Sequence, residues 1–308
     1  MYYPIPKCIP SCLREQDVPE IVEVNRLNDY YVKYLLGSEI HKDLTIHFLN
    51  DVLNRNGNQA IVDLTFSNTE YSPQLPDGKL NTLDIRCIID DGSQVNVEVQ
   101  VRRKAFIIER FLYYWAMVYG EQLQKSENYD QLRPAISINL LNFNCLPDNH
   151  WHNTYHLRND ESHTMLTDHC EIHYLELKKF TFRALLQMKR AEKWALYFSG
   201  NRGAEWRDLI MSDRTMKKVD QAEAEFTKDK ERRWQYLMQE RAIRDYNTDI
   251  KYAKQEAAQQ AAEQATANTT AMIIVNMLKA NSPYAYISQM TEYPIDKIKE
   301  IAKEHHLL

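Results

Sequence analysis

Two acidic residues, Asp84 and Glu98, flank a glycine-containing turn and could together bind a divalent cation. The turn, Asp90-Asp91-Gly92, is typical of a three-residue hairpin loop with glycine in the left-handed position. Such a loop pairs Ile89 with Ser93. Asp84 then faces Glu98 on the same side of the sheet, with Cβ atoms about 5 Å apart. A two-residue turn at Asp91-Gly92 would instead place Asp84 on the opposite face.

The chemistry expected of this pair follows from its charge. Two carboxylates that face each other across a ladder repel and destabilise it. A cation with oxygen ligands, Mg²⁺ or Mn²⁺, removes this repulsion. Such a metal acidifies bound water and offsets the charge that builds up on a phosphodiester. The alternative is a solvent-exposed strand face with mixed polar side chains, and spacing alone does not separate the two.

The strands that would position the pair are predicted from side-chain alternation. In residues 94–101 valine recurs at every second position and polar residues lie between, which predicts one buried face. Further strands are predicted at residues 59–66, 80–89, 135–143 and 171–177. Helices are predicted at residues 28–54 and at about 104–124. Strand pairs followed by helices favour α/β or α+β packing.

Glycine and proline divide the chain into parts. All seven glycines lie before residue 204, and no proline occurs between Pro147 and Pro283. The last third is therefore predicted to be nearly all helix. We expect an N-terminal extension at residues 1–24, a mixed α/β domain at residues 25–203 and a helical tail at residues 204–308. The tail should end in two short helices that begin at Pro283 and Pro294.

Short motifs follow one another along residues 25–180 in an order that is more specific than any one of them. They are Asn28-Asp29-Tyr30 with Lys33, Phe48-Leu49-Asn50, Lys79, Leu83-Asp84-Ile85, Glu98-Val99-Gln100, Arg110 with Tyr114, Gln122-Leu123, Tyr129, Leu132, Pro134, Asn142-Phe143 and Leu175-Glu176-Leu177. In this order they resemble the Rpn (recombination-promoting nuclease) family of PD-(D/E)XK transposase-type nucleases. The resemblance implies a restriction-endonuclease-like mixed sheet flanked by helices. It also implies a metal-dependent DNA endonuclease linked to recombination or mobile elements.

The resemblance also implies roles for single residues. Asp84 and Glu98 would bind the metal with the carbonyl of Val99, and Gln100 would join them as a catalytic residue. Gln100 stands where the wider fold usually has lysine, and glutamine can only hydrogen-bond and orient water. A nearby cation could supply the missing charge. The candidates are Arg102, Lys104 and Lys79.

Two further groups bear on the site. Arg110 lies four residues before Tyr114 on one helix face and could bind a phosphate. With Arg102, Lys104 and Lys79 it could form the local basic patch that DNA binding needs in a chain of net charge −5. Pro76-Asp77 spells the motif of the fold's name, but the surrounding prolines and Gly78 predict a turn there. The histidines between residues 150 and 173 lack the paired spacing of a zinc site.

Composition sets the remaining expectations. The five cysteines are scattered, which favours a reduced, cytoplasmic protein, and no apolar run approaches the length of a membrane span. The alanine- and glutamine-rich tail could form a homo-oligomer through a coiled coil. The alternative to the nuclease is a weakly active or inactive relative that uses the same fold as a DNA- or protein-binding scaffold.

Overall fold

The computed structural model describes residues 19, 22–67, 70–71, 81–82 and 84–307 of the 308-residue chain. The chain divides into two compact units, Met1–Glu240 and Arg241–Leu308. None of the helices within the described ranges combines the length and the apolar character that crossing a membrane requires.

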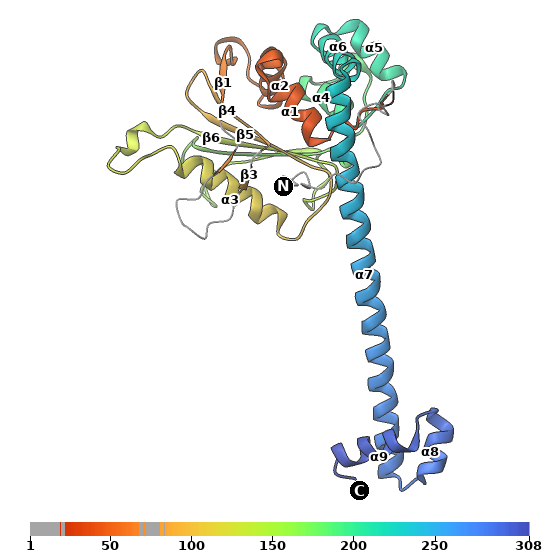
Figure 1. The fold of residues 1–308 in the computed structure, drawn as a ribbon. Coiled ribbons are helices and arrows are strands. Elements are labelled where there is room, and N and C mark those ends of the chain that lie inside the picture. The colour runs from red at the N-terminus through yellow and green to blue at the C-terminus, as the bar shows by residue number, and fades with distance from the viewer. Residues whose placement is uncertain (1–18, 20–21, 68–69, 72–80, 83, 308) are drawn as a thin grey trace. The chain divides into compact units, whose positions relative to one another are not determined.

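A mixed six-stranded sheet forms the centre of the first unit, in the order β1-β4-β5-β6-β8-β7 (Figure 1). The three middle strands β5, β6 and β8 run parallel, and the other strands pair antiparallel with their neighbours. The strands are β1 (Leu64–Phe66), β4 (Ile85–Ile89), β5 (Gln94–Gln100), β6 (Ala135–Leu141), β7 (His152–Tyr155) and β8 (Cys170–Glu176). The expected mixed sheet with flanking helices and a helical C-terminus is confirmed.

The hairpin between β4 and β5 has the predicted register. Ile85 pairs with Val97 and Cys87 with Val95, so partner numbers sum to 182 as expected for the three-residue loop. The Ile89 N–H donates to the Ser93 carbonyl at 3.1 Å. Gly92 closes the loop at φ 85°, a conformation that glycine adopts without steric cost.

The predicted strand at residues 80–89 is wrong in its first half. Asn81–Thr82 form β3, which pairs with β2 (Glu70–Tyr71) in a separate two-stranded sheet. Side-chain alternation over residues 80–89 does not show this division, because alternation does not specify which strand each residue pairs with. The strand predicted at residues 59–66 is limited to Leu64–Phe66, after a short 3₁₀ turn at Gly57–Gln59.

Helices cover both faces of the sheet. Helices α1 (Asp29–Leu36) and α2 (Lys42–Val52) lie on one side and α3 (Ile107–Gly120) on the other, as Figure 1 shows. The valines of β5 pack in one large core with α1, α2, α4 (Arg190–Phe198), α5 (Ala204–Ser212) and α6 (Arg214–Lys228). Short 3₁₀ turns complete this unit, at Glu39–His41, Tyr129–Gln131, Leu177–Lys179 and Leu185–Gln187.

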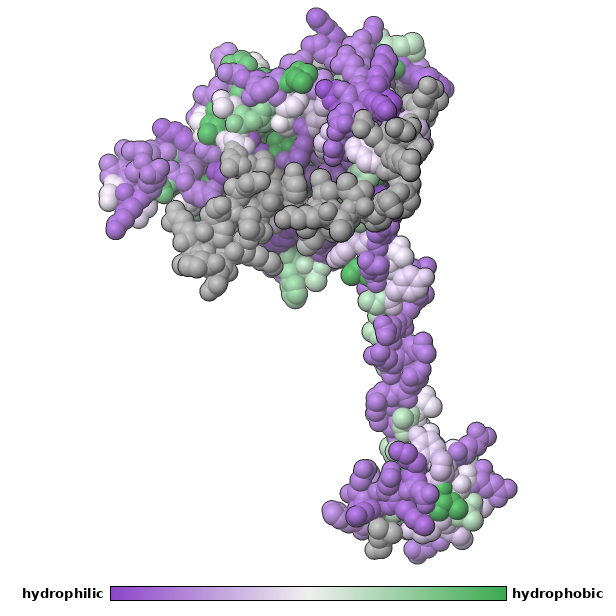
Figure 2. Space-filling model, viewed as in Figure 1, coloured by the Kyte–Doolittle hydropathy of each residue, from purple (hydrophilic) through white to green (hydrophobic). Residues whose placement is uncertain are grey.

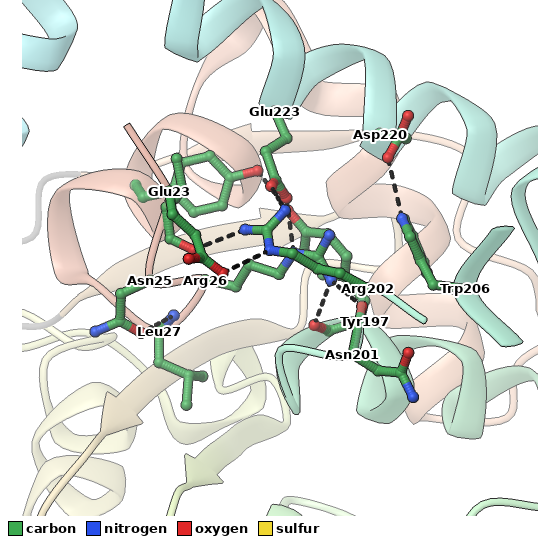
Figure 3. Close-up of polar contacts among 12 residues, drawn as sticks. Glu23, Asn25, Arg26, Leu27, Tyr197, Asn201, Arg202, Trp206, Asp220 and Glu223 are labelled. Carbon is green, nitrogen blue, oxygen red and sulfur yellow. Dashed lines mark hydrogen bonds and ion pairs between the residues drawn. The ribbon is translucent and has the colours of Figure 1, made fainter. Parts of the chain in front are cut away.

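A buried cluster of charged residues connects the segment before α1 to α4 and α6 (Figure 3). Arg26 Nε lies 2.7 Å from Glu223 Oε2, and Arg26 Nη1 donates to the Tyr197 and Asn201 carbonyls at 3.1 and 2.9 Å. Arg202 binds the other oxygen of Glu223, so the carboxylate is held between two guanidinium groups. A buried charge that lost such a partner would cost several kcal/mol, about 3–5.

The boundary predicted between residues 203 and 204 lies inside the first unit. Trp206 and Leu209 of α5 and Met216, Val219 and Phe226 of α6 belong to the same core as the valine face. This core therefore needs helices that composition alone assigned to the tail. Independent folding of either part stays a prediction.

The second unit is helical. Helix α7 (Lys230–Lys279) begins within the first unit and is followed by α8 (Tyr284–Thr291) and α9 (Ile295–Glu304). The surface of α7 is largely hydrophilic in Figure 2, in line with its alanine- and glutamine-rich sequence. Ile274, Ile287 and Ile298 are fully buried against one another. The two predicted short helices are confirmed, with Pro283 and Pro294 as N-cap residues rather than the first helical residues.

Candidate active site

Asp84 and Glu98 meet at the end of the β4–β5 hairpin. Asp84 immediately precedes β4, and the register of the hairpin places it opposite Glu98. The Asp84 N–H donates to Glu98 Oε1 at 3.3 Å, and the Val99 N–H donates to Asp84 Oδ2 at 2.7 Å. These bonds fix both carboxylates on the same side of the hairpin, as the three-residue loop predicts.

Both carboxylates are buried. The exposed fraction is 7% for Asp84 and 1% for Glu98. The alternative of a solvent-exposed polar strand face therefore does not describe this side of β5. Burial raises the pKa of Asp84 to about 7. The negative charge of Asp29 raises this pKa further, while the hydrogen bond from the Val99 N–H lowers it. Burial, and then the charge of Asp84, raises the pKa of Glu98 well above its usual range. The protein surroundings thus disfavour negative charge on this pair.

The donor set fits a hard divalent cation. Glu98 Oε2 is buried and has no hydrogen-bond partner among the described residues. The described part of the chain brings no group of three or more His, Cys, Asp or Glu side chains together for a metal. Two carboxylates would thus be completed by a backbone carbonyl and water, a combination that Mg²⁺ accepts. The Val99 carbonyl points to the same side of β5 as the Val99 N–H, toward Asp84.

Helix α1 contributes two charged residues that sequence reasoning did not assign to the site. The charge of Asp29 raises the pKa of Asp84, and that of Lys33 lowers it, so both act on the site from the first turns of α1. The two form an ion pair at 3.3 Å. Their signal was present as the i, i+4 spacing in the motif at residues 28–33, but the sequence does not show where α1 packs.

Helix α3 supplies positive charge from the other side. Arg110 lowers the pKa of Glu98, which places its guanidinium within electrostatic range of the carboxylate pair. Arg110 Nε donates to the hydroxyl of Tyr114, a buried residue of the same helix, at 2.7 Å. Burial and the nearby Arg110 lower the pKa of Lys104, while Asp84 opposes this shift. Two of the four predicted cations thus lie in the electrostatic environment of the site.

The remaining predicted residues differ in their placement. Gln100 alternates with Glu98 on β5, so both face α3, and it is 7% exposed. Arg102 was predicted to lie on the same strand face as Glu98. It is exposed and lies beyond Gln100, the last residue of β5. Lys79 and the alternative motif at Pro76-Asp77 lie outside the described residues.

A row of buried amides adjoins the carboxylate pair on the α3 side. Asn139 of β6 is the register partner of Glu98. Its Nδ2 donates to the His173 carbonyl of β8 at 3.0 Å, which turns Oδ1 away from β8, and this oxygen has no partner in the described chain. Both amide atoms of the buried Asn96 likewise have none. Sequence alternation showed these residues as polar but not that a helix covers them.

His152 of β7 and His173 of β8 form a hydrogen-bonded pair. The ring nitrogens His152 Nε2 and His173 Nδ1 lie 2.9 Å apart, and His173 Nε2 lies 2.8 Å from Glu171 Oε1. Burial lowers the pKa of His152 to about 4, and His173 adds to this. The prediction that these histidines do not bind zinc stays a prediction.

The family follows from a match over most of the chain. Residues 26–253 match the family model of the PD-(D/E)XK nuclease family transposase. The chain belongs to this family. Its mixed sheet with flanking helices is a restriction-endonuclease-like α/β fold, and membership indicates a nuclease. Comparison with curated proteins and with solved structures gave no match.

Proposed function

We propose that this protein is a metal-dependent DNA endonuclease that hydrolyses phosphodiester bonds at Asp84 and Glu98. The observation that carries the proposal is the buried carboxylate pair. Glu98 accepts a hydrogen bond from the Asp84 N–H and Asp84 accepts one from the Val99 N–H, while Glu98 Oε2 has no partner among the described residues. Such an arrangement is unfavourable unless a cation neutralises it. Mg²⁺ is the expected ion, with Mn²⁺ as a substitute of similar ligand preference.

The proposal assigns a role to each residue of the site. Asp84 and Glu98 hold the ion with the Val99 carbonyl, and the Val99 N–H orients Asp84. The ion, when bound, acidifies a water molecule and offsets charge on the phosphodiester. Gln100 orients the attacking water by hydrogen bonding, as an amide can. Arg110 and Lys104 bind phosphate oxygens and supply the positive charge that Gln100 lacks.

The wider proposals concern partners and location. DNA binds through a local basic patch that includes Arg110, Lys104, Arg102 and Lys79, since the net charge of −5 offers no general attraction. The helical tail mediates a homo-oligomer, and the reduced cysteines Cys87, Cys145 and Cys170 suit the cytoplasm. A role in recombination or mobile elements follows from the family.

A second candidate function rests on Gln100. Without a lysine at this strand position, the fold could serve as a weakly active or inactive scaffold that binds DNA or a protein. The two functions differ in whether metal and both carboxylates are needed for cleavage.

A plasmid-nicking assay tests the proposal. Purified wild type should nick supercoiled DNA with Mg²⁺ and lose this activity in EDTA, while its circular dichroism spectrum stays unchanged. Asp84→Ala and Glu98→Gln should each lower the cleavage rate by about a thousandfold. A loss of this size corresponds to the several kcal/mol by which a bound metal stabilises such a transition state. Asp160→Ala, at an exposed loop position, is the matched control and should cleave normally. Equal nicking by all four proteins would refute the nuclease site and favour the scaffold.

A further inference from the structure

Phe106 is an exposed aromatic residue in a strained backbone conformation. Its side chain is 79% exposed, and its backbone lies in the left-handed region at φ 56° and ψ 36°. A bulky residue in this region is a true outlier, and such strain is concentrated at ligand-binding and catalytic sites. Phe106 occupies the N-cap position of α3 but makes no side-chain cap hydrogen bond. Neither core packing nor helix capping therefore accounts for a phenylalanine here.

The position of Phe106 links it to the candidate active site. The Phe106 carbonyl accepts a hydrogen bond from the Arg110 N–H at 3.0 Å, so the two residues are one helical turn apart. Arg110 acts electrostatically on Glu98, and Lys104, two residues before Phe106, is acted on by Asp84. Phe106 thus belongs to the short segment, residues 104–110, that also contains the cations near the carboxylate pair.

The chain segment that carries Phe106 has both exposed apolar and basic residues. Ile108, Leu112 and Tyr113 of α3 are between 41% and 53% exposed, and the basic run Arg102-Arg103-Lys104 ends two residues before Phe106. An aromatic ring beside cations is the arrangement by which proteins bind single-stranded nucleic acid, because every base has an apolar face and every nucleotide a phosphate. An apolar partner protein would not need the adjoining cations.

We propose that Phe106 stacks on an unpaired base next to the phosphodiester that is cleaved at Asp84 and Glu98. The preferred substrate is accordingly DNA that is single-stranded on at least one side of the cleavage position. This inference rests on the proposed nuclease function and adds the substrate class. Phe106 is a substrate-contacting residue, separate from the residues that hold the metal.

Two substitutions separate the ring from the fold. Phe106→Ala removes the ring and keeps a residue that is strained in the left-handed conformation. Phe106→Gly removes the ring and relieves the strain, so it should leave thermal stability unchanged or higher. Phe106→Trp keeps a stacking surface. Tyr129→Ala is the matched control, since Tyr129 is an 84% exposed aromatic residue in a separate 3₁₀ turn.

The experiment measures binding and cleavage together. Binding of a 2-aminopurine-labelled single strand, a branched duplex with an unpaired arm and a full duplex is measured by fluorescence with Ca²⁺ in place of Mg²⁺, and cleavage of the same substrates with Mg²⁺. Wild type should prefer the two substrates with unpaired bases and quench the 2-aminopurine. Phe106→Ala and Phe106→Gly should bind these two at least about tenfold more weakly and lose the quenching, while Phe106→Trp and Tyr129→Ala behave as wild type.

Three results would overturn the inference, and they are distinguishable. If the Ala and Gly variants bind and cleave as wild type does while Glu98→Gln is inactive, Phe106 has no substrate role and the nuclease proposal stands. If wild type prefers full duplex, the substrate class is wrong. If wild type neither binds nor cleaves any of the three DNAs, the inference fails together with the proposed function.

Discussion

The two faces of the central sheet are built on opposite principles. The face toward α1 and α2 presents Val95, Val97 and Val99 to one continuous apolar core. The face toward α3 presents Asn96, Glu98 and Gln100, which are equally buried. Among the described residues, unpartnered polar atoms of β5 and β6 lie only on the second face. One strand therefore supports the apolar core on one side and carries the candidate site on the other.

This contrast shows where the fold tolerates unfavourable arrangements. Buried polar groups without partners each cost about 1–3 kcal/mol, and facing carboxylates add repulsion. Burial of the apolar face stabilises the fold enough to offset these unfavourable terms. This apolar core includes side chains of α5 and α6. Variants on the two faces should accordingly respond differently in stability and in activity.

The largest loss of stability is expected from removing α5 and α6, which pack in the same core as the apolar face. A chain that ends at residue 203 loses the six buried apolar side chains of α5 and α6 together with Glu223, the partner of Arg26. At about 1.5–3 kcal/mol for each large side chain, this approaches or exceeds the stability of a typical domain, so the fragment should be unfolded. A chain that ends at residue 253 should remain folded. Circular dichroism and limited proteolysis measure both, and a cooperatively folding fragment of residues 1–203 would support the predicted boundary instead.

The next effect compares single residues of neighbouring positions. Ile138→Ala on the apolar face should lower the free energy of unfolding by about 2–5 kcal/mol, because it leaves a cavity in the large core. Asn96→Ala on the other face removes an amide that has no partner among the described residues. This substitution should change the free energy of unfolding by less than about 1 kcal/mol. Urea unfolding followed by fluorescence gives both values. Equal losses would show that the α3 face is packed as tightly as the valine face.

A smaller effect concerns pH in the absence of metal. The pKa of Asp84 is raised from 3.8 to about 7. Between these values the folded state keeps a proton that the unfolded state has released, so rising pH favours unfolding. Stability should therefore fall from pH 4 to pH 7, by at most about 1.4 kcal/mol per pH unit for this one group. Asp84→Asn should flatten the decline and Asp160→Asn should not. A decline that Asp84→Asn leaves unchanged would mean that another group titrates.

The smallest expected effect is at Gln100. Gln100→Lys introduces a cation on the same strand face as Glu98 and should leave the cleavage rate unchanged or raise it by up to about tenfold. Gln100→Met, of similar size but without the amide, should lower the rate. Initial rates of plasmid nicking at saturating Mg²⁺ measure both. If Gln100→Lys, Gln100→Met and Glu98→Gln all cleave as wild type, the α3 face is not a nuclease site.

Local patterns predicted the parts of the site that neighbouring residues determine. The glycine at Gly92 predicted the loop, the loop predicted the register, and the register brought Asp84 opposite Glu98. Each step involves residues fewer than fifteen positions apart. The site residues Asp29 and Lys33 were not predicted, because their approach to Asp84 depends on how α1 packs on the sheet. The division of residues 80–89 between two sheets was also missed, because alternation does not show with which strand residues 81–82 pair.

The sequence by itself determined the strand alternation, the hairpin and the carboxylate pair, since side-chain period and turn geometry are local properties of the backbone. Only the tertiary structure decided that both faces of β5 are buried. Alternation distinguishes a polar face from an apolar one, but a helix more distant in the fold decides whether the polar face meets water. The cover of α3 turns a polar stripe into a buried site with raised pKa values for Asp84 and Glu98, because burial is a property of the whole fold.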